Sequence, residues 1–125
     1  MTIFVKNKHT LQIDEFNFQC SVGKNGITTK KIEGDKKTPA GFFKIEHLYY
    51  REDKINLPKT DLKCIKIREK MGWCNDKNYP KKYNQLINVS DKIGHEKLFR
   101  EDHKYDLLIP IKFNYNKRIP GKGSC

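Results

Sequence analysis

Cysteine thiols are the side chains of this sequence that could act as nucleophiles. Cys74, between Trp73 and Asn75, and Cys125, after Gly123-Ser124, lie in segments that we expect to be loops, so they are the accessible candidates. Thiol catalysis also needs a base within hydrogen-bond reach and donors that face the developing oxyanion. The sequence gives no distance between a cysteine and a histidine, and the interpretation as an inert thiol is favoured for both residues.

A metal site is the second chemistry that these residues could support. Cys64, Cys74, His95 and His103 could together supply four zinc ligands. Their spacing matches no compact ligand knuckle, and the sequence contains no Cys-x-x-Cys pair. We therefore expect no metal and no cofactor, and we interpret Cys20 and Cys64 as small core residues.

Short strands separated by turns are the elements that must position these side chains. Segments 2–5 and 10–13, separated by a polar turn, predict a hairpin, and strict alternation over 16–22 predicts a third strand. Gly23–Gly26 supplies a reversal, because glycine tolerates positive φ. Segment 34–41 predicts two successive turns before the next strand. Further strands are expected over 27–32, returning antiparallel, and over 43–49, 62–67, 83–89 and 105–115.

Two segments do not fit the strand pattern. Segment 70–76 predicts a loop with Trp73 as its anchor. Segment 90–100 predicts one short helix, with Ser90 as its N-cap and apolar residues near helical spacing. The expected fold is therefore mainly β with one short helix, in a single domain over residues 1–125.

The net charge of +11 points to binding of a polyanionic partner as one possible function. The basic residues are mostly lysines scattered along the chain, which does not favour specific nucleic-acid binding. The apolar opening segment is too short for a signal peptide, and no run is long enough for a membrane span. The charge leaves one hypothesis open, namely a non-catalytic basic β domain that binds cell-wall polymer or another polyanion.

The motif Gly34-Asp35-x-x-Thr38-Pro39-x-Gly41-x-Phe43 resembles the N-terminal motif of the L,D-transpeptidase catalytic domain. This family cross-links peptidoglycan through a cysteine acyl-enzyme. More of the chain is similar, in order and spacing, to a compact bacterial branch of the family. The similar segments are Leu48-Tyr49-Tyr50-Arg51-x-Asp53, Met71-Gly72-Trp73-Cys74-x-Asp76, Tyr83-Asn84, His95-Glu96-x-Leu98-x-Arg100-x-Asp102, Tyr105-Asp106 and Gly121-x-Gly123-Ser124. The resemblance extends over nearly the whole chain.

The resemblance implies an antiparallel β-sandwich or barrel and a nucleophile that this sequence does not show. After the position of Gly123-Ser124, similar proteins continue with a strand ending in His and a Ser/Thr-x-Gly-Cys loop that carries the nucleophile. We therefore expect a domain incomplete at its C-terminus, with the catalytic Cys and His beyond Cys125 and no catalytic residue in this chain. Cys125 takes the place of a small strand residue and is not the nucleophile.

By resemblance, the chain would supply the scaffold and one groove wall for peptidoglycan stem peptides. Trp73, His95, Glu96 and Arg100 are the groove candidates. The alternative is that Glu96 and Arg100 form a solvated ion pair on the predicted helix and that Trp73 fills the core. The family transfers an acyl group to an amine, or to water as a carboxypeptidase, which implies the periplasm or cell envelope. No signal peptide is visible, so the sequence as written predicts the cytoplasm.

Overall fold

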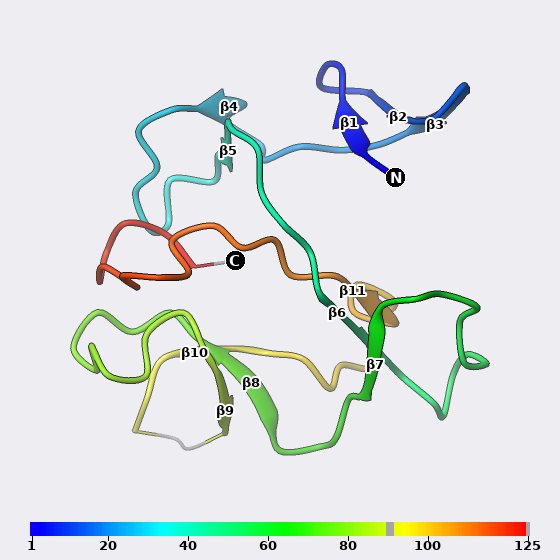
Figure 1. The fold of residues 1–125 in the computed structure, drawn as a ribbon. Coiled ribbons are helices and arrows are strands. Elements are labelled where there is room, and N and C mark those ends of the chain that lie inside the picture. The colour runs from blue at the N-terminus through cyan, green and yellow to red at the C-terminus, as the bar shows by residue number, and fades with distance from the viewer. Residues whose placement is uncertain (90–91, 125) are drawn as a thin grey trace. The chain divides into compact units, whose positions relative to one another are not determined.

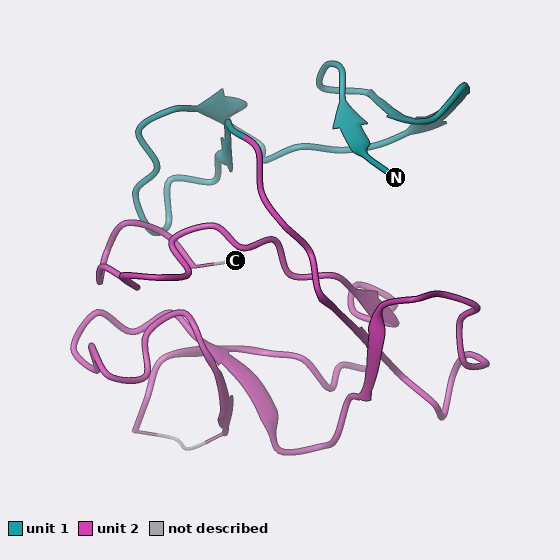
Figure 2. Cartoon of the chain, viewed as in Figure 1, with its two compact units in different colours: residues 1–41 teal, residues 42–125 magenta. Residues whose placement is uncertain are grey.

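A computed structural model describes residues 1–89 and 92–124 of the chain. Its internal contacts divide it into two compact units, unit 1 over residues 1–41 and unit 2 over residues 42–125 (Figure 2). Strands are the only regular elements among the described residues, which confirms the mainly β fold (Figure 1). These residues contain no helix with the length and hydropathy needed to cross a bilayer. The single domain stays a prediction.

Unit 1 begins with a three-stranded antiparallel sheet. Its strands are β1 (Ile3–Val5), β2 (Thr10–Ile13) and β3 (Phe16–Gln19), in the order β1-β2-β3. In the turn between β1 and β2, the Asn7 side-chain oxygen accepts hydrogen bonds from the N–H groups of His9 and Thr10, both at 2.9 Å. This side chain satisfies backbone donors that the strands cannot reach, and the predicted hairpin is confirmed.

One face of this sheet is entirely apolar. The strand register places Ile3 opposite Ile13 and Ile13 opposite Phe16, and it places Val5, Leu11 and Phe18 in a second such row. Phe16 is nevertheless 60% exposed and Phe18 50% exposed. Every buried hydrophobic side chain among the described residues belongs to unit 2. Unit 1 therefore has paired strands but no core of its own.

The remaining strands of unit 1 are β4 (Ile27–Thr28) and β5 (Thr38–Pro39), which pair in parallel. The predicted antiparallel return over 27–32 is wrong, because the chain leaves β4 after two residues and comes back through a loop before pairing. The predicted reversal before β4 is confirmed. The Gly26 N–H donates to the Gly23 carbonyl at 2.8 Å, and Gly26 has a φ of 91°.

Asp35 organises the loop between β4 and β5. Its carboxylate accepts hydrogen bonds from the N–H groups of Ile32 at 2.9 Å and Lys37 at 2.8 Å, and it pairs with the Lys31 ammonium at 2.5 Å. Burial acts to raise the pKa of Asp35, but these donors outweigh it and lower the pKa to about 2. Asp35, the aspartate of the Gly34-Asp35 motif, thus holds the loop between β4 and β5 together.

We expect Asp35→Asn to lower the melting temperature at pH 7 and to have little effect near pH 2. The pKa of Asp35 is depressed in the folded chain, so its ionised carboxyl stabilises the fold above its unfolded-state pKa of about 3.9. That contribution is lost as the pH falls toward about 2. Thermal melts of both proteins by circular dichroism at the two pH values check this. An equal difference at both pH values would contradict it.

Unit 2 contains two three-stranded sheets. One has the order β11-β6-β7 and the other β10-β8-β9 (Figure 1). The bounds are β6 (His47–Tyr50), β7 (Lys63–Lys66), β8 (Met71–Cys74), β9 (Leu86–Asn88), β10 (His95–Lys97) and β11 (Leu107–Leu108). All pairs are antiparallel except the parallel pair β6·β7. The core of unit 2 gathers around Tyr49, Ile67, Trp73 and Leu98.

Three predictions for unit 2 are wrong. The described part of segment 90–100 contains β10 and no helix, because residues 95–97 pair with β8. The predicted cap Ser90 lies outside the described residues. Segment 70–76 contains strand β8 rather than a loop. The predicted strand over 105–115 is reduced to β11 and a single bridge between Ile45 and Ile111.

Arg51 connects two parts of unit 2 that lie far apart in the sequence. Its guanidinium makes two hydrogen bonds of 2.7 Å to the Asp53 carboxylate and a third to the Arg100 carbonyl. The same group lies 3.6 Å from the centre of the Phe99 ring. Arg51 is only 4% exposed, so this cation is stabilised by its partners and not by bulk water. It ties the chain after β6 to the chain after β10.

Candidate functional site

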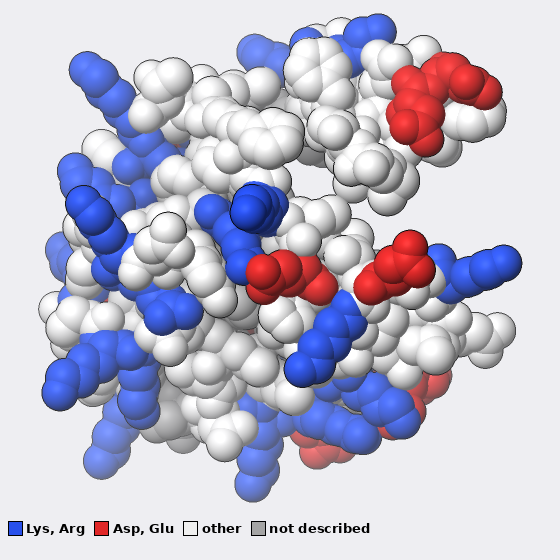
Figure 3. All heavy atoms as spheres, viewed as in Figure 1, with Lys and Arg blue, Asp and Glu red and all other residues white. Residues whose placement is uncertain are grey.

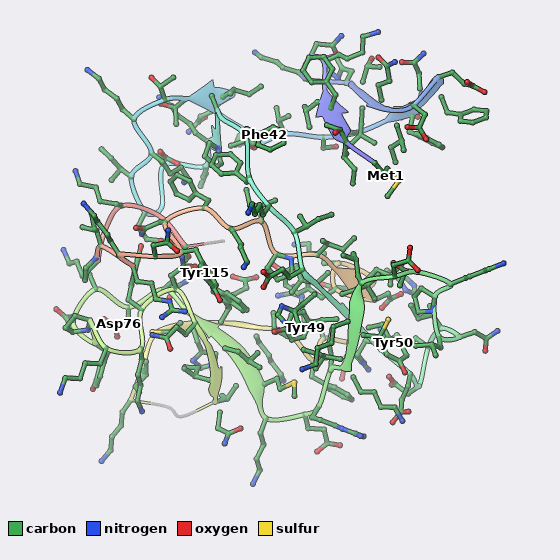
Figure 4. The ribbon with its side chains drawn as sticks, in the orientation of Figure 1. Met1, Phe42, Tyr49, Tyr50, Asp76 and Tyr115 are labelled. Carbon is green, nitrogen blue, oxygen red and sulfur yellow. The ribbon has the colours of Figure 1, made fainter. Side chains whose placement is uncertain are left out.

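Unit 2 contains an open pocket of about 250 Å³. The aromatic and charged side chains that line it are Tyr49, Trp73, Tyr115, His47, Glu46, Lys112 and Arg118. Figure 4 labels Tyr49, which comes from β6, and Tyr115, which follows β11. The pocket therefore combines apolar rings with charges of both signs, contributed by segments far apart in the sequence.

Trp73 of β8 belongs both to the core and to this pocket. Its ring packs edge-on against Tyr49, with ring centres 6.4 Å apart, and only 9% of the residue is exposed. The indole N–H donates to the Asn84 side-chain oxygen at 2.9 Å. Because both its ring and its N–H have partners, Trp73 is fixed in place. It fills the core, as the alternative interpretation held, and also lines the pocket.

Asparagine side chains hold the segment 114–123, which we call the C-terminal loop, against the rest of unit 2. The Asn84 amide donates to the carbonyls of Phe113 and Asn114, both at 3.0 Å. Asn114 donates to the carbonyls of Ile119 and Gly123, both at 3.0 Å, and accepts from the Ile119 N–H at 2.9 Å. These bonds fix the two ends of the segment that carries Tyr115 and Arg118.

The charges in the pocket gather around Tyr115. The Lys112 ammonium lies 4.6 Å from the centre of its ring and the Arg118 guanidinium 5.0 Å. Lys112 also pairs with Glu46, and its hydrogen bond holds the pKa of that carboxyl below the usual value. The two opposite charges of Glu46 and Lys112 therefore balance each other, whereas Arg118 adds a positive charge.

The sequence prediction did not single out Lys112, Tyr115 or Arg118. Tyr115 was interpreted only as part of the strand over 105–115, which spans Lys112, and Arg118 only as one of the few arginines among the basic residues. The signal that could have found them is a tyrosine flanked by basic residues just before the Pro120-Gly121 turn. Such a signal is weak, because exposed tyrosines and basic residues are common in loops.

Of the four groove candidates, only Trp73 lines the pocket. His95 and Glu96 belong to β10, where His95 lies opposite Cys74 and Glu96 opposite Trp73. Arg100 follows the strand and binds Asp102 through its Nη2 at 2.6 Å. A role of His95, Glu96 and Arg100 in substrate binding stays a prediction.

The side chains of Glu96 and Arg100 form an ion pair, with 3.8 Å between Nη1 and Oε1. The pair exists without the helix on which it was expected. The Tyr105 hydroxyl donates to Glu96 at 3.1 Å. Burial, aided by the Glu96 carboxylate, raises the pKa of Tyr105 to about 12, so the hydroxyl keeps its proton at neutral pH. This cluster is a network of ion pairs and hydrogen bonds that ties β10 to the segment before β11.

Cys74 is fully buried, and its expected accessibility is wrong. The reason is that residues 71–74 form the central strand β8 between β9 and β10. Cys20 and Cys64 are partly exposed and not core residues, although each thiol lies near a backbone carbonyl. Cys125 lies outside the described residues. A reacting thiol must reach its substrate, so Cys74 does not fit a nucleophile.

We expect Cys74 to resist alkylation in the folded protein while Cys20 and Cys64 react. A thiol with no exposed surface can react only after local or global opening of the chain. Iodoacetamide labelling followed by peptide mass spectrometry measures each site, and labelling in urea gives the fully reactive control. Equal labelling rates for Cys74 and Cys64 without urea would contradict the buried position.

The possible zinc ligands do not converge. Cys74 and His95 are cross-strand partners, but Cys64 belongs to β7 in the other sheet and the His103 ring contacts Asp106. Within residues 1–89 and 92–124, no three or more His, Cys, Asp or Glu side chains gather as a metal ion would require. The described residues therefore offer no zinc site of the kind that we considered.

The fold and the pocket define a mainly β domain with an aromatic and charged pocket. A family model described as YkuD, L,D-transpeptidase catalytic domain, matches residues 1–121. The chain therefore belongs to this family, whose members act on peptidoglycan peptides. Comparisons with curated proteins and with solved structures gave no match. The resemblance in the sequence motifs is thus confirmed at the level of the family.

Proposed function

We propose that this chain supplies the scaffold and one groove wall of a peptidoglycan L,D-transpeptidase, with the pocket of unit 2 as its stem-peptide site. The family match supports the reaction class, and the pocket is the single observation that carries the assignment of the site. Its rings can cover the aliphatic parts of a peptide, and its charged groups can bind peptide carboxylates and amines. With such a substrate, the location that we propose is the periplasm or cell envelope.

The proposed reaction is acyl transfer through a cysteine thiolate. The sulfur attacks the carbonyl of an L,D peptide bond, a C–S bond forms, and the C–N bond breaks as the terminal D-amino acid leaves with a proton on its amine. An amine of a second stem then takes the acyl group, and water in its place gives carboxypeptidase activity. The 125 residues contain no Ser/Thr-x-Gly-Cys motif, so the proposal assigns the nucleophile to none of them.

Trp73 gives this proposal a direct test, because it is the only tryptophan and it lines the pocket. We expect a soluble stem tetrapeptide to change its fluorescence in a saturable way, and an all-L peptide of the same composition to bind more weakly. Intact-mass spectrometry of the same 125-residue chain should show no acyl adduct. An acyl adduct on any of the four cysteines would contradict the assignment of the nucleophile.

Two tyrosines provide matched variants for this binding experiment. Tyr115 and Tyr79 are each 37% exposed, but only Tyr115 lines the pocket. Tyr115→Ala should weaken binding of the tetrapeptide several-fold, and Tyr79→Ala should leave it unchanged. Equal affinities for the two variants would show that the peptide binds elsewhere.

Polyanion binding is the alternative function, supported by the net charge of +11. On the face drawn in Figure 3, Lys and Arg side chains are scattered among uncharged residues and do not gather into one patch. Binding of polyphosphate that falls steeply with added salt, together with no response to the tetrapeptide, would favour this alternative.

A further inference from the structure

Arg118 is a cation of the pocket that has no anionic partner among residues 1–89 and 92–124. The described residues offer it no hydrogen-bond acceptor and no carboxylate, and its Nε is buried with no acceptor. The guanidinium lies 5.0 Å from the centre of the Tyr115 ring. Lys112, on the same ring, is paired with Glu46. The pocket therefore has one guanidinium whose hydrogen-bonding capacity the described protein does not use.

The backbone around Arg118 is held in a defined shape. Arg118 itself has a φ of 45°, in the left-handed region that residues other than glycine seldom adopt. The Asn114 side chain bonds both the N–H and the carbonyl of Ile119, the next residue. Because these bonds fix the chain directly after Arg118, its guanidinium is presented to the pocket from a preorganised loop. Preorganisation lowers the entropy lost when a ligand binds.

A carboxylate is the group that such an arginine fits best. The guanidinium fork matches the two oxygens of a carboxylate, and the resulting pair of charged hydrogen bonds is stronger than neutral ones. The Tyr115 ring holds the cation from one side. Glu46 and Lys112 balance each other, so the Glu, Lys and Arg side chains that line the pocket leave one positive charge for an anion, and His47 beside them adds no negative charge.

We propose that Arg118 is a specificity-determining residue that binds one carboxylate of the substrate peptide in the pocket of unit 2. The inference rests on the proposed function, because it takes the stem peptide as the ligand. A stem peptide has a carboxylate at its C-terminus and others on its side chains. Both kinds offer the same chemistry to Arg118, and the experiment separates them.

The test compares four proteins, the wild type and three variants, with three peptides in the tetrapeptide titration. Arg118→Gln removes the charge in the pocket, and Arg68→Gln makes the same change at an arginine that does not line it and whose side chain is 62% exposed. The peptides are the free tetrapeptide, its C-terminal amide, and a form with its side-chain carboxylates amidated. We expect Arg118→Gln to weaken binding of the free peptide about tenfold, as loss of a charged hydrogen bond would. Arg68→Gln should bind like the wild type.

Amidation identifies the carboxylate. One of the two amidated peptides should bind the wild type about tenfold more weakly and should lose nothing further with Arg118→Gln. Arg118→Lys keeps the charge but not the forked guanidinium, so its affinity for the free peptide should lie between those of the wild type and Arg118→Gln. Amide NMR spectra check that each variant is folded. Equal binding by wild type and Arg118→Gln would overturn this inference alone. Absence of tetrapeptide binding to the wild type would overturn the proposed function and the inference with it.

Discussion

Replacing Asn84 by alanine is expected to lower the free energy of unfolding by about 3 kcal/mol or more. Asn84 is 1% exposed and connects Trp73 to the carbonyls of Phe113 and Asn114. Alanine leaves the buried indole N–H and two partly buried carbonyls without that partner, and a buried polar group left unpaired costs about 1–3 kcal/mol. The φ of 54° at this position adds to the cost, because alanine adopts the left-handed region less readily than asparagine.

Urea unfolding followed by Trp73 fluorescence measures the effect of this substitution. Asn116→Ala is the matched control, since Asn116 is an exposed asparagine of the C-terminal loop. The control should change stability by less than about 0.5 kcal/mol. The folded Asn84→Ala protein should also differ in its emission spectrum, because the indole N–H loses its partner. A loss of stability no larger than that of the control would contradict the role of Asn84.

Arg51→Ala is the second substitution with a large expected effect, a loss of about 3 kcal/mol. The variant loses charged hydrogen bonds to Asp53, the bond to the Arg100 carbonyl and the contact with the Phe99 ring. Alanine also leaves a void where a buried side chain packed. Asp53 itself keeps access to water, because its side chain is 49% exposed, so the loss is smaller than for a fully buried pair.

Two further variants define what Arg51 contributes. Arg68→Ala removes an arginine that is 62% exposed and pairs with Glu52, and it should cost less than about 1 kcal/mol. Arg51→Lys keeps the charge but cannot make the two parallel bonds to Asp53, so it should recover only part of the loss. Chemical unfolding of the three variants under one buffer gives the comparison. Full recovery by lysine would show that charge alone matters.

Local patterns were enough to predict the first hairpin. Its strands alternate in sequence, and a polar turn of four residues joins them, so the pairing partners are neighbours along the chain. The predicted helix failed for the opposite reason. Residues 95–97 are held by β8, about twenty positions earlier, and a pairing of that range leaves no periodic signal within the segment itself.

The candidate site could be predicted only in part. Trp73 stood out because it is the only tryptophan, whereas nothing distinguished Arg118 from the other arginines of the sequence. The pocket depends on Glu46, Trp73, Lys112 and Arg118 coming together from separate segments. Their spacing in the sequence is set by loops of arbitrary length, so it carries no signal. The family motifs identified the enzyme class, but the pocket geometry required the structure.

The apolar face of the β1-β2-β3 sheet has a consequence for engineering. A segment can be moved between proteins as an independent cassette only when it buries enough apolar surface to offset the conformational entropy lost on folding. Residues 1–41 bury no large hydrophobic side chain of their own, and Phe16 and Phe18 stay at least half exposed. Grafted alone onto a carrier, this piece would unfold or self-associate through its edges. Residues 1–41 are therefore unsuited to use by themselves.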